Sequence, residues 1–285
     1  LVHCDPGPRE VRLYTTQRHP GVGYTDAAEN IVTGKDGYFR PIDPCVAPDG
    51  SIYITDWYDG GVGGHAYNDP TRGRIYRLVP MGRKLVRGDK PGPYTSDADA
   101  LQALSSPNLA TAYLARTRLI SSGNSVVKML EMVVGGTASL KTPRLQLVKS
   151  RAMWVLDRIG GEALQVIRRQ LQSEDAAFRA LAVRILRRHE SEFETDILKL
   201  AGDADGEVRK EVLLAAGGWK TPEADAVVLA GYAAYDGRDR YLLETLGIAS
   251  RGREDKFFQK VVPADEPADV RRVNIVRLLH PKSGL

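Results

Sequence analysis

Hydrophobic and polar positions follow two different rhythms along the chain. In the first third, short runs alternate apolar with polar or small residues, as in Ser51–Thr55, and such alternation is typical of a strand with one covered face. Clusters that favour turns, such as Pro48-Asp49-Gly50, separate these runs. The pattern predicts an all-β region over residues 1–82, with strands at 11–16, 29–33, 51–55 and 74–79.

A helical rhythm begins after a linker, rich in glycine and proline, that is predicted over residues 83–97. Three helix starts are marked by a capping hydroxyl followed by proline: Ser106-Pro107, Thr142-Pro143 and Thr221-Pro222. One stretch shows the helical spacing i, i+3, i+4, i+7 and i+8 in its apolar residues, which are Phe178, Leu181, Ala182, Ile185 and Leu186. Helices are therefore predicted from residue 98 onward, with second helices of pairs at 163–171, 193–201, 224–235 and 256–262.

Arginines recur in the helical region with spacings of 28, 30, 31 and 31 residues: Arg151, Arg179, Arg209, Arg240 and Arg271. Three of them follow an aspartate by four residues, in the pairs Asp175 with Arg179, Asp205 with Arg209 and Asp236 with Arg240. On a helix this spacing places both charges on one face, where they set the register of stacked repeats. The rhythm resembles HEAT repeats, and predicts an α-solenoid of about five to six helix pairs over residues 98–285.

The order of strands and turns over residues 40–79 resembles one blade of a β-propeller. A blade needs on the order of 40 residues and propellers close with about four to eight blades, so the all-β region holds one to two blades. The remaining blades would come from upstream sequence or from another chain. The expected fold class is thus multidomain α+β, with a partial β-propeller followed by an α-solenoid of HEAT-like repeats.

Composition and charge narrow the classes of function. The chain is 42% hydrophobic and 27% charged, and it contains no apolar run long enough to cross a membrane. Its net charge of +4 permits acidic partners but is spread along the chain. The two cysteines, Cys4 and Cys45, lack the spacing of a zinc site or a haem attachment site. The sequence leaves two possibilities for them, a disulfide or two buried free thiols.

The loop that follows the predicted strand 51–55 gathers polar and aromatic residues among its glycines: Asp56, Tyr58, Asp59, His65, Asp69, Arg72 and Arg74. Carboxylate oxygens suit a hard cation, so Asp56 and Asp59 are candidate calcium ligands. His65 is a candidate general base for an alcohol proton, and Arg72 could bind an anionic group through two hydrogen bonds. Tyr58 and Arg74 complete the candidate substrate-binding set with Arg72.

The same loop has a structural interpretation. Aspartates in glycine-rich loops often accept hydrogen bonds from turn amides, and His65 would then be a buried, hydrogen-bonded histidine. Arg72 and Arg74 would pair with Asp69 or with a helical repeat. Trp57 and Tyr58 would pack at the edge of the sheet, because aromatic side chains in such positions more often pack than bind sugars.

A family resemblance is carried by five segments: Phe39-Arg40-Pro41, Pro48-Asp49-Gly50, Asp56-Trp57-Tyr58-Asp59, Gly63-Gly64-His65 and Arg72-Gly73-Arg74-Ile75-Tyr76-Arg77. Together they resemble the closing blade of a large bacterial family described as membrane-bound dehydrogenases, which is abundant in planctomycetes. Members of that family carry a six-bladed propeller similar to soluble quinoprotein glucose dehydrogenase, then HEAT repeats, and often a c-type haem domain.

The resemblance implies that the chain is part of a periplasmic or extracellular protein that oxidises an alcohol or a sugar and passes electrons to haem. Calcium and a quinone are the cofactors it suggests. Haem would lie outside this chain, which has no Cys-x-x-Cys-His motif. No quinone-binding residue can be assigned, and the catalytic centre would be completed by residues outside the chain.

Two functions from other classes compete with the dehydrogenase. The first is a non-catalytic scaffold that binds a protein or a glycan on the concave face of the solenoid; Asp56 and Asp59 turned onto backbone amides would favour it. The second is nucleic-acid binding by the arginine ladder, which we expect less because the paired aspartates neutralise the arginines. His189 and His280 lie at predicted helix ends, where a structural role is expected.

Overall fold

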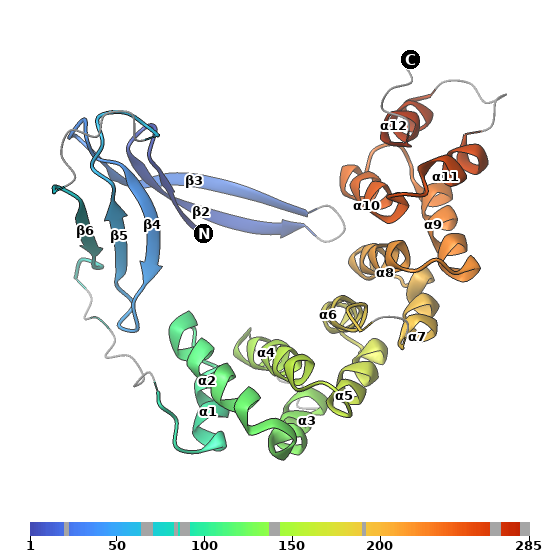
Figure 1. The fold of residues 1–285 in the computed structure, drawn as a ribbon, viewed down its shortest axis with the longest axis horizontal. Coiled ribbons are helices and arrows are strands. Elements are labelled where there is room, and N and C mark those ends of the chain that lie inside the picture. Colours follow the sequence, from blue (N-terminus) through green and yellow to red (C-terminus); the bar gives the residue numbers. More distant parts are fainter. Residues whose placement is uncertain are drawn as a thin grey trace. The chain divides into compact units, whose positions relative to one another are not determined.

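The computed structural model describes residues 1–19, 23–63, 71–82, 85, 92–136, 143–189, 192–262 and 269–279. The chain divides into two compact units, which are described separately. Unit 1 comprises Leu1–Arg18, Tyr24–Val126 and Lys141–Arg151, and unit 2 comprises His19–Gly23, Val127–Leu140 and Ala152–Leu285. The order of the elements along the chain can be followed in Figure 1.

The strands form two sheets of three strands each. The first sheet has the order β1 (Val2–Asp5), β2 (Glu10–His19) and β3 (Gly23–Thr33). The second has the order β4 (Pro41–Val46), β5 (Ile52–Asp56) and β6 (Arg74–Leu78), with antiparallel neighbours. The four strands expected from the alternation of residues are confirmed as β2, β3, β5 and β6.

The expectation of a partial β-propeller is wrong. The described residues form two small sheets of three strands, and neither a four-stranded blade nor a closed barrel is present among them. Strand and turn signals locate the strands but do not determine which strands pair. Here β4 pairs with β5. The strand β3 ends at Thr33, and the amide of the next residue, Gly34, donates to the carbonyl of Arg9 in the turn between β1 and β2.

A small hydrophobic core joins the two sheets. Cys4, Val11 and Ile54 are buried at its centre, and partly buried apolar residues pack around them: Val2, Val32, Ile52 and Leu78. Both cysteines are free thiols, with Cys4 buried and Cys45 exposed. Burial raises the pKa of the Cys4 thiol.

Twelve α-helices lie among the described residues. They are α1 (Asp97–Leu104), α2 (Leu109–Ser122), α3 (Val127–Gly135), α4 (Pro143–Ile159), α5 (Ala163–Arg169), α6 (Ala176–Leu186), α7 (Glu194–Leu198), α8 (Gly206–Gly218), α9 (Pro222–Ala234), α10 (Arg240–Ser250), α11 (Glu254–Val261) and α12 (Val270–Leu279). Short 3₁₀ turns follow α2, α5 and α7, at Gly123–Val126, Gln170–Gln172 and Lys199–Gly202.

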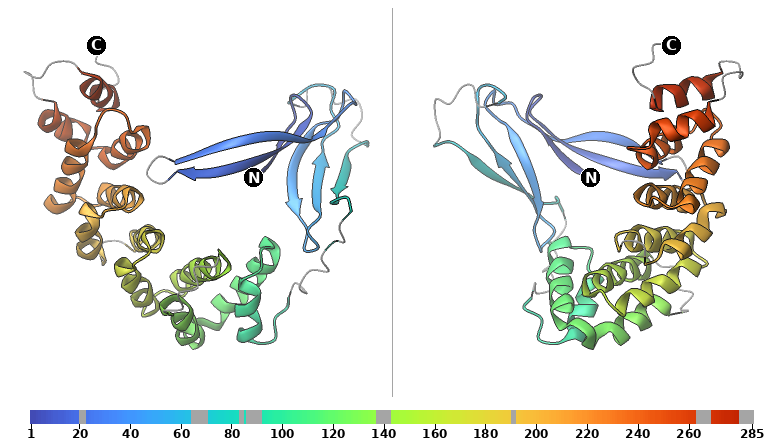
Figure 2. Two further views of the ribbon diagram at one scale, coloured as in Figure 1. Left: turned by 180° about the vertical axis from the view of Figure 1, so that it is seen from behind. Right: turned by 45° about the vertical axis from the view of Figure 1, so that its right-hand side comes forward.

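The helices of unit 2 stack in two layers. Helices α6, α8, α10 and α12 pack side by side in one layer, and α5, α7, α9 and α11 make up the other, as Figures 1 and 2 show. Consecutive helices thus form the pairs α4/α5, α6/α7, α8/α9 and α10/α11. This stacking of helix pairs does not exclude the α-solenoid that was predicted for the helical half of the chain.

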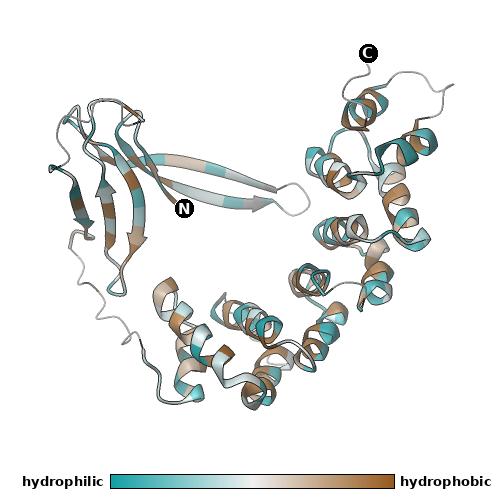
Figure 3. Ribbon diagram, viewed as in Figure 1, coloured by the Kyte–Doolittle hydropathy of each residue, from teal (hydrophilic) through white to brown (hydrophobic). Residues whose placement is uncertain are grey.

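Amphipathic sequence explains the two layers. Figure 3 shows hydrophobic and hydrophilic positions interleaved on the helices, and the fully buried positions between layers are apolar, among them Ile167, Ile185, Val212 and Leu246. Polar side chains cap the amino ends of the helices; they are Ser96, Asn108, Asp175, Asp205, Thr221 and Asp239. Within the described part of the chain, no helix has both the length and the apolar character needed to cross a membrane.

Candidate functional site

The carboxylate of Asp56, at the end of β5, is buried and fully engaged by the protein. Its Oδ1 accepts hydrogen bonds from the backbone amides of Arg40, at 2.8 Å, and Tyr58, at 3.0 Å. Its Oδ2 accepts the Nε–H of Arg74 at 2.8 Å. Asp56 therefore fixes three segments: the start of β4, the turn after β5 and the start of β6.

Asp59 closes the turn that follows. Its side chain is buried, and its Oδ1 accepts the amide of Gly61 at 3.1 Å. Its own amide donates to the carbonyl of Tyr38 at 2.9 Å. The nearby Arg40 guanidinium is also buried and donates to the carbonyls of Phe39 and Gly60. These contacts are those of a tightly hydrogen-bonded loop.

Arg74 lies among aromatic rings and carboxylates. Its guanidinium carbon is 4.5 Å from the ring centre of Tyr58 and 5.5 Å from that of Tyr76. Its Nη2 pairs with Asp36 at 3.2 Å. The ring of Tyr58 also stacks on Tyr38, with centroids 5.2 Å apart. Tyr58 adopts a positive φ of 51°, so the surrounding contacts hold its backbone in an uncommon conformation.

The calcium interpretation does not fit these contacts. An oxygen that already accepts two N–H groups, and a second oxygen paired with a guanidinium, repel a cation through the positive ends of their donors. Among the described residues, no three acidic, histidine or cysteine side chains gather in a way that could hold a metal ion. The contacts of Asp56 therefore do not fit a calcium site, and calcium binding by Asp59 stays a prediction.

Only some of the other residues predicted for this loop lie close to Asp56. Tyr58 and Arg74 come together with Asp56, as described above. Arg72 is exposed on the approach to β6. His65 and Asp69 lie outside the described residues, so the role predicted for His65 as a general base stays a prediction.

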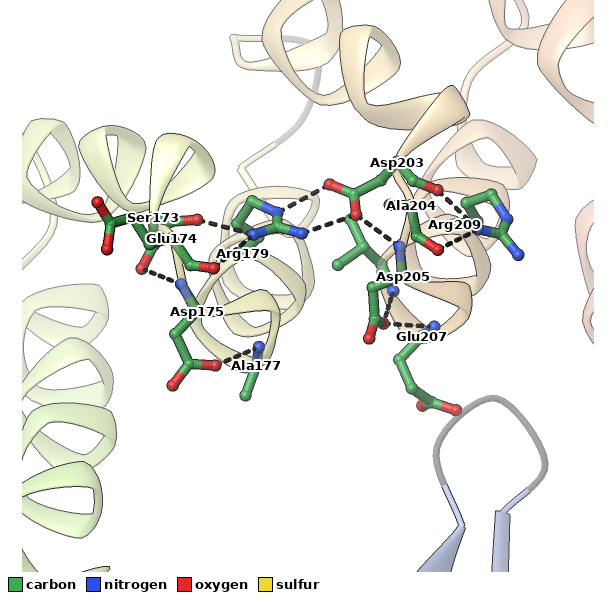
Figure 4. Close-up of polar contacts among 11 residues, drawn as sticks. Ser173, Glu174, Asp175, Ala177, Arg179, Asp203, Ala204, Asp205, Glu207 and Arg209 are labelled. Atoms are coloured by element: carbon green, nitrogen blue, oxygen red, sulfur yellow. Dashed lines mark hydrogen bonds and ion pairs between the residues drawn. The ribbon is translucent and has the colours of Figure 1, made fainter. Parts of the chain in front are cut away.

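One arginine of the ladder, Arg179, connects neighbouring helix pairs (Figure 4). Asp175 caps α6 by accepting the amide of Ala177 at 2.9 Å. Arg179 donates from Nε and Nη2 to the two oxygens of Asp203, each at 2.8 Å, and from Nη1 to the carbonyl of Ser173 at 2.8 Å. The hydrogen bonds from Arg179 lower the pKa of Asp203, and the amide of Asp205 adds to this effect.

The two other aspartate–arginine pairs of the ladder differ from each other. Asp205 caps α8, and Arg209 donates to the carbonyls of Asp203 and Ala204, at 2.6 and 2.9 Å, which matches the contacts of Arg179 with its own preceding turn. Arg240 instead pairs with Glu244 on the same helix, and Asp236 accepts the amides of Arg238 and Asp239 in a turn. The equal spacing in sequence therefore does not give equal contacts.

Further charged contacts between helix pairs were not predicted. The buried carboxylate of Asp157 on α4 binds His189 Nε2 at 2.8 Å and Arg188 at 3.3 Å, and this contact gives His189 a structural role. Glu211 on α8 binds Arg184 of α6, and Asp225 on α9 binds Arg253 and Lys256. In each case the partners are 27 to 32 residues apart. Opposite charges separated by one repeat length were the signal that could have revealed them.

We call these contacts, together with Arg179–Asp203, the inter-pair bridges. Each uses a largely buried carboxylate on one helix pair and a cation of the neighbouring pair or turn. Because their guanidinium groups are already bound by carboxylates and carbonyls, these arginines are poorly suited to a polyanion. Comparison with family models and with curated proteins found no match to this chain.

Proposed function

We propose that this chain is a non-catalytic scaffold that binds a partner protein. The observation that carries the proposal is the set of large apolar side chains left exposed on and beside the second sheet: Ile42, Val46, Tyr53, Trp57, Val62, Ile75, Tyr76, Val79 and Met81. The set spans both faces of the sheet, because adjacent residues such as Ile75 and Tyr76 point to opposite sides. Exposed apolar and aromatic residues in such number are typical of protein interaction surfaces.

The helical unit supports a scaffold role. Its inter-pair bridges hold consecutive helix pairs in a fixed register. Arginines also donate hydrogen bonds to the free carbonyls at the carboxyl ends of helices. Arg253, for example, donates to the carbonyls of Ala216, Gly217 and Trp219. A preorganised support loses little conformational freedom when a partner binds, so more of the contact energy appears as affinity.

The engaged carboxylates of Asp56 and Asp59 also favour a scaffold over an enzyme at this loop. The dehydrogenase function, its quinone and the transfer of electrons to haem stay predictions of the family resemblance, as does a periplasmic or extracellular location. Glycan binding and nucleic-acid binding have no contact in the described residues that favours them over a protein partner.

Selection from a random-peptide display library on the wild-type chain tests the proposal. We expect enrichment of peptides that bind with a dissociation constant of about micromolar or tighter, equally in EDTA and in calcium. Parallel arms measure the binding of saccharides, and of DNA and heparin at increasing salt. Failure to enrich any binding peptide, or specific saccharide binding that requires calcium, would contradict the proposal.

A further inference from the structure

We draw no further inference here: the strongest candidate, the apolar pocket of about 210 Å³ beside the edge strand β6, lined by Phe39, Tyr76 and Leu78, carries none, because nothing in the described part of the structure shows what covers it.

Discussion

Arg179 binds Asp203 through two parallel hydrogen bonds, Nε to Oδ2 and Nη2 to Oδ1, each 2.8 Å long. The same guanidinium holds the carbonyl of Ser173, so one side chain joins the turn before α6 to the turn before α8. Bidentate pairing of this kind is stronger and more directional than a simple ion pair. The side chains of Arg179 and Asp203 are only 16% and 7% exposed, which reduces screening by water.

Replacing Arg179 by alanine should lower the free energy of unfolding by about 2–3 kcal/mol, because it leaves the buried Asp203 carboxylate without its main partner. Urea unfolding measures the change. Arg240→Ala is the matched control from the same sequence ladder, since the Arg240 side chain is 83% exposed and should contribute little. Equal losses in the two variants would show that the Arg179 bridge has no special role.

Acid should remove the contribution of this bridge. Hydrogen bonds from Arg179 hold the pKa of Asp203 below its ordinary value of 3.8. A carboxyl whose pKa is lower in the folded than in the unfolded state stabilises the folded protein at pH values above its unfolded-state pKa. This stabilisation is lost as the pH falls through the folded-state pKa. The difference in unfolding free energy between the wild-type chain and Asp203→Asn should therefore be constant from about pH 7 to pH 5 and should shrink below about pH 4. A difference that persists unchanged to about pH 3 would contradict this cause.

Two cations share the carboxylate of Asp225, and we expect them to contribute unequally. Arg253 is mostly buried and also donates to several carbonyls at helix ends, whereas Lys256 is half-exposed. Arg253→Ala should cost about 2–4 kcal/mol of unfolding free energy, and Lys256→Ala less than about 1 kcal/mol. Thermal unfolding of both variants checks the order. A larger loss in Lys256→Ala would mean that charge alone, and not the carbonyl contacts, holds these helices.

Neighbouring glycines at the end of α8 should respond in opposite directions to alanine. A Cβ on Gly217 would lie 2.6 Å from the Cα of Ala249 on α10, so Gly217→Ala must push the two helices apart, at a cost of about 1–3 kcal/mol. Gly218 has no atom within 4 Å of such a Cβ. Gly218→Ala should be neutral or stabilise by up to about 1 kcal/mol, by restricting the unfolded chain. Melting temperatures that fall equally would contradict this packing.

Asp56 should behave as a structural carboxylate. Asp56→Ala leaves two amides and the Arg74 guanidinium without their acceptor, which should cost about 2–4 kcal/mol. Calcium should not raise the melting temperature of the wild-type chain, because a ligand stabilises a protein only in proportion to its occupancy of the folded state. A calcium-dependent rise that disappears in Asp56→Asn would restore the metal interpretation.

The positions of the elements could be read from local sequence to a large extent. The helix predicted from Thr142-Pro143 is α4, which begins at Pro143 and ends at Ile159. The second helices expected at 163–171 and 193–201 are found as α5 and α7, each extended by a 3₁₀ turn. Capping residues and helical periodicity act over a few residues, so they are visible in a single sequence.

Pairing over longer distances could not be read in this way. The propeller expectation failed because alternation identifies β5 and β6 but does not show that their sheet stops at three strands. The i, i+4 ladder placed Asp175 and Arg179 together as a pair, whereas a stronger bidentate partner, Asp203, lies 24 residues away. Asp175 could either cap α6 or pair with Arg179. In the structure it caps the helix and Arg179 pairs with Asp203, and the sequence alone does not show which contact forms.

The scaffold function depends most directly on whether the chain binds extended polypeptide. The decisive measurement is the dissociation constant of the selected peptides for the wild-type chain, determined in EDTA and in calcium. We predict a constant of about micromolar or tighter that is the same in both solutions. The absence of any binding peptide, together with calcium-dependent saccharide binding that is lost in Asp56→Asn, would contradict the scaffold and favour an enzyme.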